Sequence, residues 1–148
     1  MNTGFNPHIS VDIAVFGFDD NEGLKVLLIN RDKNKNTHTS KLKLPGSLII
    51  IRERLHNSAH RVLQELTGIK DIYLKPFEVF DNPERLQNGE DLQWLCESSG
   101  IIVERVVTIA YYSLVKLHHY SETELSKAYN ARWFSLESVP DLIFDHNE

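Results

Sequence analysis

The residues with the clearest chemical meaning lie within residues 45–69, where a Pro-Gly turn and an apolar run precede an isolated Glu53 and a helix-like segment. Side chains at positions i, i+3 and i+4 of a helix share one face, and from position 62 this face carries Val62, Glu65 and Leu66. Mg²⁺ requires several oxygen ligands in near-octahedral geometry. One carboxylate between two aliphatic side chains is a poor Mg²⁺ site, so the helix has the spacing of an acidic metal-binding helix without most of its acids.

This segment resembles the Nudix box of the Nudix hydrolase family, whose pattern is G-x5-E-x7-R-E-U-x-E-E-x-G-U, where U is a bulky aliphatic residue. Gly68 and Ile69 stand at the end of the pattern. Four further positions match, namely the upstream glutamate, the arginine, the first aliphatic residue and the first of the paired acids, which are Glu53, Arg61, Leu63 and Glu65.

Three positions depart from the pattern. Ser47 stands at the first glycine, Val62 at the glutamate after the arginine, and Leu66 at the second of the paired glutamates. In the family those two acids are among the principal metal ligands, so their replacement implies a vestigial box and puts hydrolysis in doubt. Glu65 alone would hold a metal ion weakly. We therefore expect no cofactor, or Mg²⁺ if the domain is hydrolytically active.

Glu53 and Arg61 keep their positions in the pattern. In the family, groups at these positions orient the box loop through a salt bridge and hydrogen bonds. We expect an ion pair that fixes the loop to the helix, in preference to a catalytic role, and we assign no catalytic residue beyond this vestigial set.

The predicted elements follow an α/β (α+β) order without internal repeats. Alternating or β-branched runs predict strands at Ile9–Phe18, Leu24–Asn30, short pieces within Leu42–Ile51, Asp71–Phe80, Ile101–Leu117 and Ala131–Leu136. Turn residues at 19–23 join the first two strands as a hairpin. Pro76 marks an edge position or a bulge in its strand.

Apolar residues at positions 55, 59, 62, 63 and 66 predict an amphipathic helix over Leu55–Thr67, which Gly68 ends. This pattern also makes Val62 and Leu66 core positions. The two interpretations agree, because a position filled by a buried aliphatic side chain cannot also be a metal ligand.

Residues 82–100 are interrupted by turn residues and form the least regular part of the chain. Within them, EDLQWLCE predicts a short helix with Leu92, Leu95 and Cys96 on one face. Trp94 could pack over a pocket, but a surface helix anchored by its own apolar face is the favoured interpretation.

Composition favours one soluble domain. The 148 residues are 41% hydrophobic and 25% charged, which is typical of a globular domain. The net charge of −5 provides no broad basic surface for a phosphate backbone. Cys96 is the one cysteine, which excludes an internal disulfide and favours a reducing, cytoplasmic setting. We expect no signal peptide, because the first residues lack a basic segment followed by an apolar stretch. No run of about 18 apolar residues that could cross a membrane is present in the sequence.

Three further segments, ERVVTIAYYSLV, ARWFSLESVPDL and IFDH, resemble the sensor domain of Nudix-related transcriptional regulators. This group controls NAD-cofactor or sugar metabolism and includes arabinose regulators. The resemblance implies a Nudix fold, with a mixed β-sheet sandwiched between helices. It also implies binding of a small metabolite, a sugar or nucleotide derivative, and a homodimer.

In these regulators a winged helix-turn-helix domain follows the sensor domain and binds DNA. Asp145 follows an apolar residue and would be a good N-cap for a helix, but the sequence ends three residues later. We therefore expect residues 1–148 to form a single Nudix-like domain of a longer protein. DNA contact is expected only through the C-terminal domain that is missing here.

Three basic residues are candidate ligand-binding residues. Arg31 ends a predicted strand, Lys43 precedes the Pro-Gly turn, and Arg105 starts the long strand. For each of them, a solvated surface charge is an equally good interpretation. Tyr111 and Tyr112 point to opposite faces of a strand, so we expect one in the core, while the other could stack on a sugar or base.

Two functions compete. The favoured one is a catalytically degenerate, ligand-sensing domain of a transcriptional regulator. The alternative is an active Nudix hydrolase that cleaves a nucleoside diphosphate linked to another moiety, such as ADP-ribose, with Mg²⁺. It would use Glu53 and Glu65 with acids from the insertion, for which Glu90, Asp91 and Glu97 are available.

Overall fold

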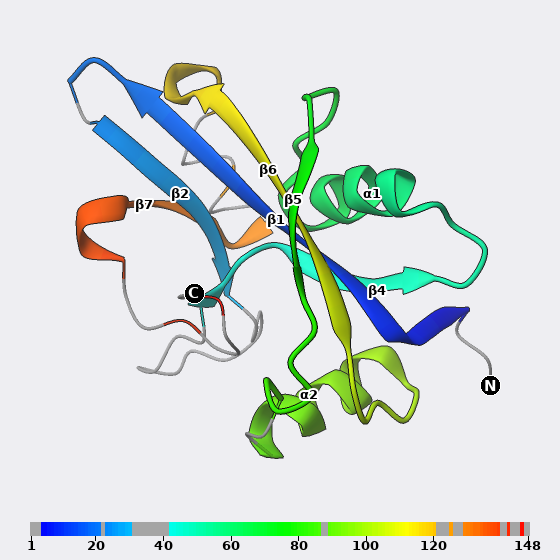
Figure 1. Cartoon of the computed structure of the whole chain (residues 1–148). Coiled ribbons are helices and arrows are strands. Elements are labelled where there is room, and N and C mark those ends of the chain that lie inside the picture. The colour runs from blue at the N-terminus through cyan, green and yellow to red at the C-terminus, as the bar shows by residue number, and fades with distance from the viewer. Residues whose placement is uncertain are drawn as a thin grey trace.

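The computed structural model describes residues 4–21, 23–30, 42–86, 89–120, 125, 129–139, 142 and 146. Within these residues, seven strands form one sheet with two α-helices (Figure 1). The strands are β1 (Phe5–Asp19), β2 (Gly23–Asn30), β3 (Leu42–Lys43), β4 (Gly46–Ile50), β5 (Lys75–Phe80), β6 (Val107–Lys116) and β7 (Ala131–Ser135). The helices are α1 (Leu55–Thr67) and α2 (Gly89–Ser99).

The long strand β1 organises the sheet. The order of hydrogen-bonded strands in the sheet is β3-β2-β1-β6-β5, while β4 pairs with β1 and β7 pairs with β2. The β1–β6 pair is parallel and the other pairs are antiparallel, so the sheet is mixed, as predicted. The predicted hairpin at 19–23 is also confirmed, because Asp19 pairs with Gly23 across the turn.

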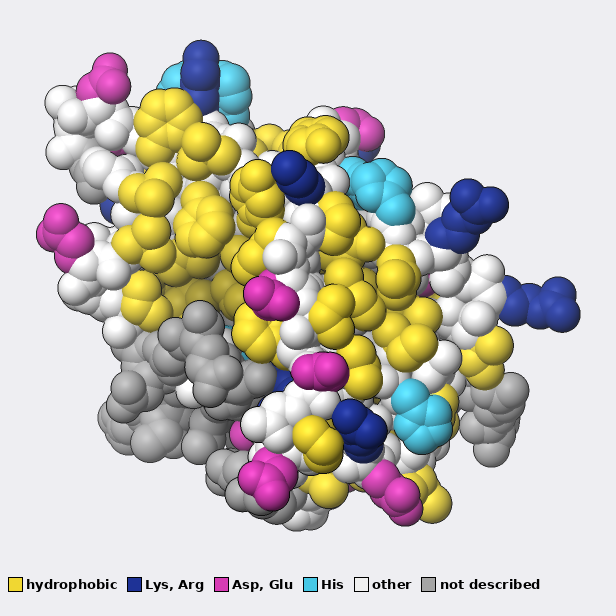
Figure 2. Space-filling view, viewed as in Figure 1, with side chains coloured by type: hydrophobic (Ala, Val, Ile, Leu, Met, Phe, Trp, Pro, Cys, Tyr) yellow, Lys and Arg dark blue, Asp and Glu magenta, His cyan; other side chains and the backbone are white. Residues whose placement is uncertain are grey.

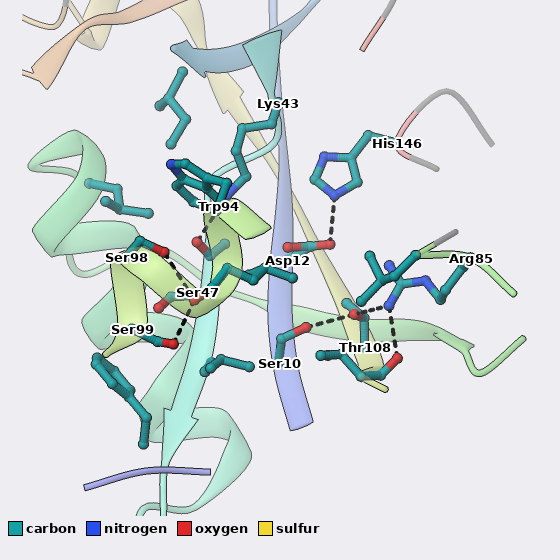
Figure 3. A pocket seen from close by; sticks show the side chains of 18 of the residues that line it. Ser10, Asp12, Lys43, Ser47, Arg85, Trp94, Ser98, Ser99, Thr108 and His146 are labelled. Carbon is teal, nitrogen blue, oxygen red and sulfur yellow. Dashed lines mark hydrogen bonds and ion pairs between the residues drawn. The ribbon is translucent and has the colours of Figure 1, made fainter. Parts of the chain in front are cut away.

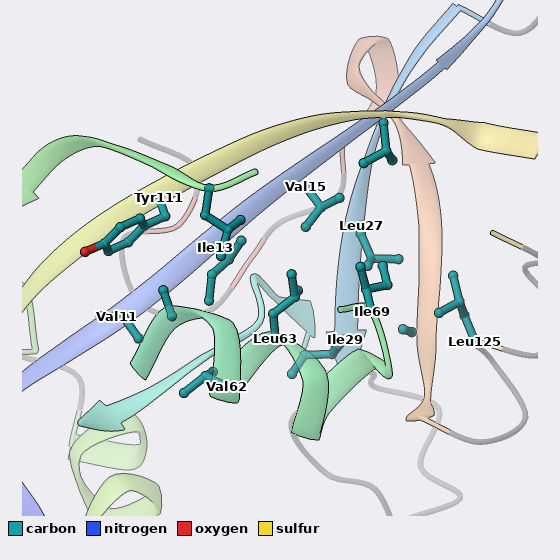
Figure 4. Packing of buried hydrophobic residues seen from close by; sticks show 14 of the residues in the cluster. Val11, Ile13, Val15, Leu27, Ile29, Val62, Leu63, Ile69, Tyr111 and Leu125 are labelled. Atoms are coloured by element: carbon teal, nitrogen blue, oxygen red, sulfur yellow. The ribbon is translucent and has the colours of Figure 1, made fainter. Parts of the chain in front are cut away.

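Successive side chains of β1 point to opposite faces of the sheet. Val11, Ile13 and Val15 are completely buried beneath α1 (Figure 4). Ser10 and Asp12 point to the opposite face of the sheet. This strand therefore separates the main core from a polar region on the other side of the sheet.

Helix α1 has the predicted bounds and buries the predicted stripe. Ala59, Val62 and Leu63 are fully buried against the sheet, and Leu66 is partly buried. The helix ends at Gly68, whose φ of 77° is unfavourable for other residues. A Cβ at this position would also lie 2.6 Å from the Tyr129 ring, so both conformation and space require glycine.

Two strands begin later than predicted. Strand β5 starts at Lys75 instead of Asp71, and β6 starts at Val107 instead of Ile101. In the second case Val103 N–H donates to the Cys96 sulfur at 3.3 Å, so this backbone pairs with α2 and not with the sheet. Strand β5 lies at the sheet edge and shifts register near its proline, in agreement with both predicted features.

Beyond Ser10 and Asp12, the face of the sheet away from α1 carries apolar side chains. Tyr111 is buried in the main core, whereas Tyr112 points outward and meets Phe77 edge-to-face at 5.7 Å. Leu114 is exposed on the same face. Figure 2 shows hydrophobic side chains gathered over this face. In the part of the chain that is described, no helix is long and apolar enough to cross a membrane.

Candidate functional site

The segment that resembles the Nudix box contains the predicted ion pair. Arg61 Nε lies 2.8 Å from Glu53 Oε2, and Arg61 Nη2 donates to Glu53 Oε1 at 3.0 Å. The Ser58 hydroxyl donates to the same carboxylate. The hydrogen bond from Arg61 is the main cause that lowers the pKa of Glu53, and the same bond raises the pKa of Arg61. Glu53 therefore holds the loop before α1 against this helix.

The remaining box positions do not form a set of metal ligands. The Glu65 side chain is 61% exposed and contacts Arg61 Nη1 at 3.1 Å. Val62 lies in the core, and Leu66 lines a cavity. Among the described residues, no group of three or more His, Cys, Asp or Glu side chains is placed to hold a metal ion. This donor set does not fit Mg²⁺, which needs several convergent oxygens.

Of the acids named in the insertion, Asp91 and Glu97 do not complete that set. Asp91 is buried in α2, and Glu97 accepts a hydrogen bond from Gln93 at 2.9 Å. Neither residue is among those lining the cavities. The Glu90 side chain lies outside the described part of the chain.

Replacing Glu53 with Gln is expected to lower the free energy of unfolding by about 2 kcal/mol, because Arg61 loses charge-assisted hydrogen bonds in a mostly buried position. Glu65→Gln is the matched control and should cost about 0.3 kcal/mol, as expected for an exposed i,i+4 pair. Urea titration measures both values, and equal effects would contradict the assigned role of Glu53.

The loss of stability in Glu53→Gln relative to wild type depends on pH. The pKa of folded Glu53 lies below its ordinary value of 4.5, so its stabilisation is complete above that pH and is lost as the pH falls through the folded pKa. The difference between wild type and Glu53→Gln should therefore shrink as the pH falls below 4.5.

A cavity lies beside the box on the side of the sheet where Ser10 and Asp12 point (Figure 3). The Ser47–Leu48 stretch of β4 forms one wall, α2 forms another, and Leu66 reaches it from α1. Its charged or hydrogen-bonding side chains include Ser10, Asp12, Lys43, Arg85, Thr108 and His146.

Asp12 is the buried carboxylate of this cavity. His146 Nε2 lies 3.0 Å from Asp12 Oδ2, and the Leu44 N–H donates to His146 Nδ1 at 3.1 Å. Since Nδ1 accepts a hydrogen bond, the ring proton is on Nε2 and is donated to Asp12. Burial alone would raise the pKa of Asp12, but His146, Lys43 and Arg85 outweigh it and hold the pKa below its usual value.

Gly46 allows Asp12 to take this position. A Cβ on Gly46 would lie 1.8 Å from Asp12 Oδ1 and 2.8 Å from the Val11 carbonyl oxygen. The glycine of the Pro-Gly turn is therefore required by the close approach of the carboxylate.

Lys43 and Trp94 form the opposite part of the wall. Lys43 is only 4% exposed; its Nζ donates to the Gly46 carbonyl at 3.1 Å and lies 5.4 Å from the centroid of the Trp94 ring. This geometry is a cation–π contact. Helix α2 is anchored by its apolar face, as predicted, through Leu92 and its neighbours. The less favoured prediction is also right, because Trp94 does pack over a pocket.

Arg85 continues the polar wall along β6. Its Nη1 donates to the Val106 carbonyl at 3.1 Å and to the Thr108 hydroxyl, which in turn bonds the Ser10 hydroxyl at 2.6 Å. Parallel pairing of β1 with β6 places Ser10 directly opposite Thr108.

The three basic candidates from the sequence are placed differently. Lys43 lines the cavity. Arg105 does not; it is exposed and its Nη2 donates to the Asp81 carbonyl at 2.9 Å. Arg31 lies outside the described residues.

Sequence reasoning missed Asp12, Arg85 and His146. A signal existed for Asp12, because Ser10 and Asp12 alternate with apolar residues in a strand and so had to share a polar face. No comparable signal existed for His146, whose backbone partner Leu44 is 102 residues away.

Comparisons with known proteins agree with this architecture. No family model matches the chain. The chain is 29% identical over 147 residues to the ADPR responsive transcriptional repressor NtrR of Acinetobacter baylyi, which covers 97% of this chain and 51% of that protein. The chain therefore spans about half the length of this curated relative.

Solved structures share the fold. The chain resembles NrtR of Shewanella oneidensis with a TM-score of 0.68 and 24% identity, over 94% of this chain and 58% of that one. It resembles the Nudix domain of the same protein in complex with ADP ribose with a TM-score of 0.64 and 23% identity, over 96% and 82% of the two chains. For a MutT/nudix family protein from Enterococcus faecalis the TM-score is 0.67, with 21% identity over 95% and 58%. The predicted fold is thereby confirmed.

Proposed function

We propose that this domain, which has the Nudix fold, is the ligand-sensing part of a transcriptional regulator and binds ADP-ribose or a related nucleotide sugar without cleaving it. The observation that carries the proposal is the state of the box beside the cavity. The Glu53–Arg61 pair that shapes the loop is intact, whereas Val62 lies in the core and Leu66 faces the cavity. A groove remains in which the principal metal ligands are replaced.

The cavity has groups suited to each part of such a ligand. Trp94 offers an aromatic face for a ring, and Lys43 and Arg85 supply positive charge for a pyrophosphate. Asp12 is ionised and accepts hydrogen bonds, which suits the hydroxyl groups of a ribose. A mostly apolar lining with a few placed polar groups is the usual composition of a small-molecule site.

The relatives support the ligand and the regulatory role. The Acinetobacter protein is named as an ADPR responsive transcriptional repressor, and the Shewanella Nudix domain was crystallised with ADP ribose. Shewanella NrtR was also crystallised with a 27mer DNA, and this chain covers 56% of that chain. We assign DNA binding to a further domain outside residues 1–148, in a homodimeric protein. The net charge of −5 on this chain agrees with that assignment.

Two measurements on the same protein test the proposal. Calorimetric titration with ADP-ribose, NADH and nucleoside diphosphate sugars should show saturable binding of ADP-ribose. Incubation with Mg²⁺ and the same compounds should release no AMP or other phosphate-containing product. Glu65→Gln should change neither result, because the side chain is exposed and does not line the cavity.

Two outcomes would overturn the proposal. If none of these compounds binds, the sensing role is overturned. Turnover that requires Mg²⁺ and that Glu65→Gln abolishes would show that the domain is an active Nudix hydrolase.

A further inference from the structure

Two cavities meet at the Asp12–His146 pair. The cavity described above has a volume of about 230 Å³ and a second one about 460 Å³. Asp12, Arg85 and His146 line both. The second cavity lies on the apolar outer face of the sheet, against Phe16 of β1 and Val26 of β2. Sites for small molecules usually occupy about 300–1,000 Å³, so the first cavity alone is small for a nucleotide sugar.

His146 is held at this junction by two hydrogen bonds. Its side chain is 4% exposed, its Nδ1 accepts from Leu44 and its Nε2 donates to Asp12. Both ring nitrogens are therefore occupied, which leaves neither of them to act as a general base. The ring instead holds residue 146 against β1 through its contact with Asp12, as Figure 3 shows.

Asp12 is the one carboxylate among the described residues that line either cavity. Its Oδ1 is packed against Gly46, and its Oδ2 accepts from His146. A ligand that presents hydroxyl donors to this carboxylate must therefore compete with the His146 ring.

We infer that His146 is a latch that a diol-bearing ligand displaces: the hydroxyls take over the Asp12 carboxylate, the imidazole leaves, and the two cavities join into one longer groove. The inference rests on the proposed function, since the riboses of ADP-ribose supply the diols. Displacement of the His146 ring would couple occupancy of the cavity to the position of residue 146.

His146→Ala tests the latch by affinity. A competing side chain reduces the fraction of protein that is ready to bind, so its removal should tighten ADP-ribose binding about tenfold. His118→Ala is the matched control, because that ring is exposed and does not line either cavity, and it should leave the affinity unchanged. Both are measured by calorimetry after thermal melts confirm folding.

A second measurement uses the wild-type protein. Long-range ¹⁵N–¹H NMR spectra should show a His146 ring with a bare Nδ1 and a protonated Nε2 in the absence of ligand. Saturating ADP-ribose should shift these ring signals to those of a solvent-exposed histidine and leave the His118 ring unchanged.

The outcomes separate the two proposals. ADP-ribose that binds while the His146 ring signals stay unchanged, or weaker binding by His146→Ala, overturns the latch and leaves the sensing role intact. If neither the wild type nor His146→Ala binds ADP-ribose or any of the nucleoside diphosphate sugars, both proposals are overturned.

Discussion

Replacing Val62 with glutamate is expected to lower the free energy of unfolding by about 4 kcal/mol, enough to unfold much of the protein. Val62 is completely buried in the main core, and the described residues of that core offer a carboxylate no charged partner to offset its loss of hydration. Urea titration followed by tryptophan fluorescence measures this loss.

Leu66→Glu is the matched variant and should behave differently. Leu66 is partly buried and lines the cavity, so its replacement should cost about 1–2 kcal/mol by loss of packing. It also adds a carboxylate near the vestigial box, which should raise Mg²⁺ affinity in a calorimetric titration. If Val62→Glu folds normally and increases Mg²⁺ affinity as much as Leu66→Glu, the assignment of the two helix faces is wrong.

Replacing Lys43 with methionine is expected to weaken ADP-ribose binding at least about tenfold, which corresponds to about 1.4 kcal/mol. Lys43 is buried in the cavity wall over the Trp94 ring, and methionine keeps most of the aliphatic stem while removing the charge. A pyrophosphate in a partly enclosed site depends strongly on such a charge, because solvent screens it little. Calorimetry at constant ionic strength gives the affinity.

Arg105→Met is the control of equal charge change. Arg105 is exposed and bonded to the Asp81 carbonyl, away from the cavity lining, so the affinity should stay within about twofold of wild type. A larger effect of Arg105→Met than of Lys43→Met would place the ligand elsewhere on the protein.

Much of the fold could be predicted because local signals agreed with burial. Helix α1 combines an apolar stripe with a glycine stop, and its predicted bounds match. The predicted starts of β5 at residue 71 and of β6 at residue 101 were wrong. Apolar residues in these segments, such as Leu74 and Val103, are buried without being in the sheet. Burial in a connecting segment leaves the same apolar composition as burial in a strand, so composition alone cannot separate them.

The site was predictable only where it followed a local pattern. The Glu53–Arg61 pair could be predicted from one continuous segment. The contact of Asp12 with His146 depends on how the chain returns to β1, and no spacing in the sequence encodes it. Trp94 belongs to a helix whose own apolar face explains its packing, so its role in the cavity required the three-dimensional arrangement.

The Glu53–Arg61 ion pair shapes the loop before α1 with protein groups alone. In an enzyme whose loop is organised around bound magnesium, the geometry of the groove varies with the supply of that ion. Here the partner of the Glu53 carboxylate is the Arg61 guanidinium. Under the proposed sensing function, a loop held in this way would keep the shape of the groove when the supply of divalent ions changes.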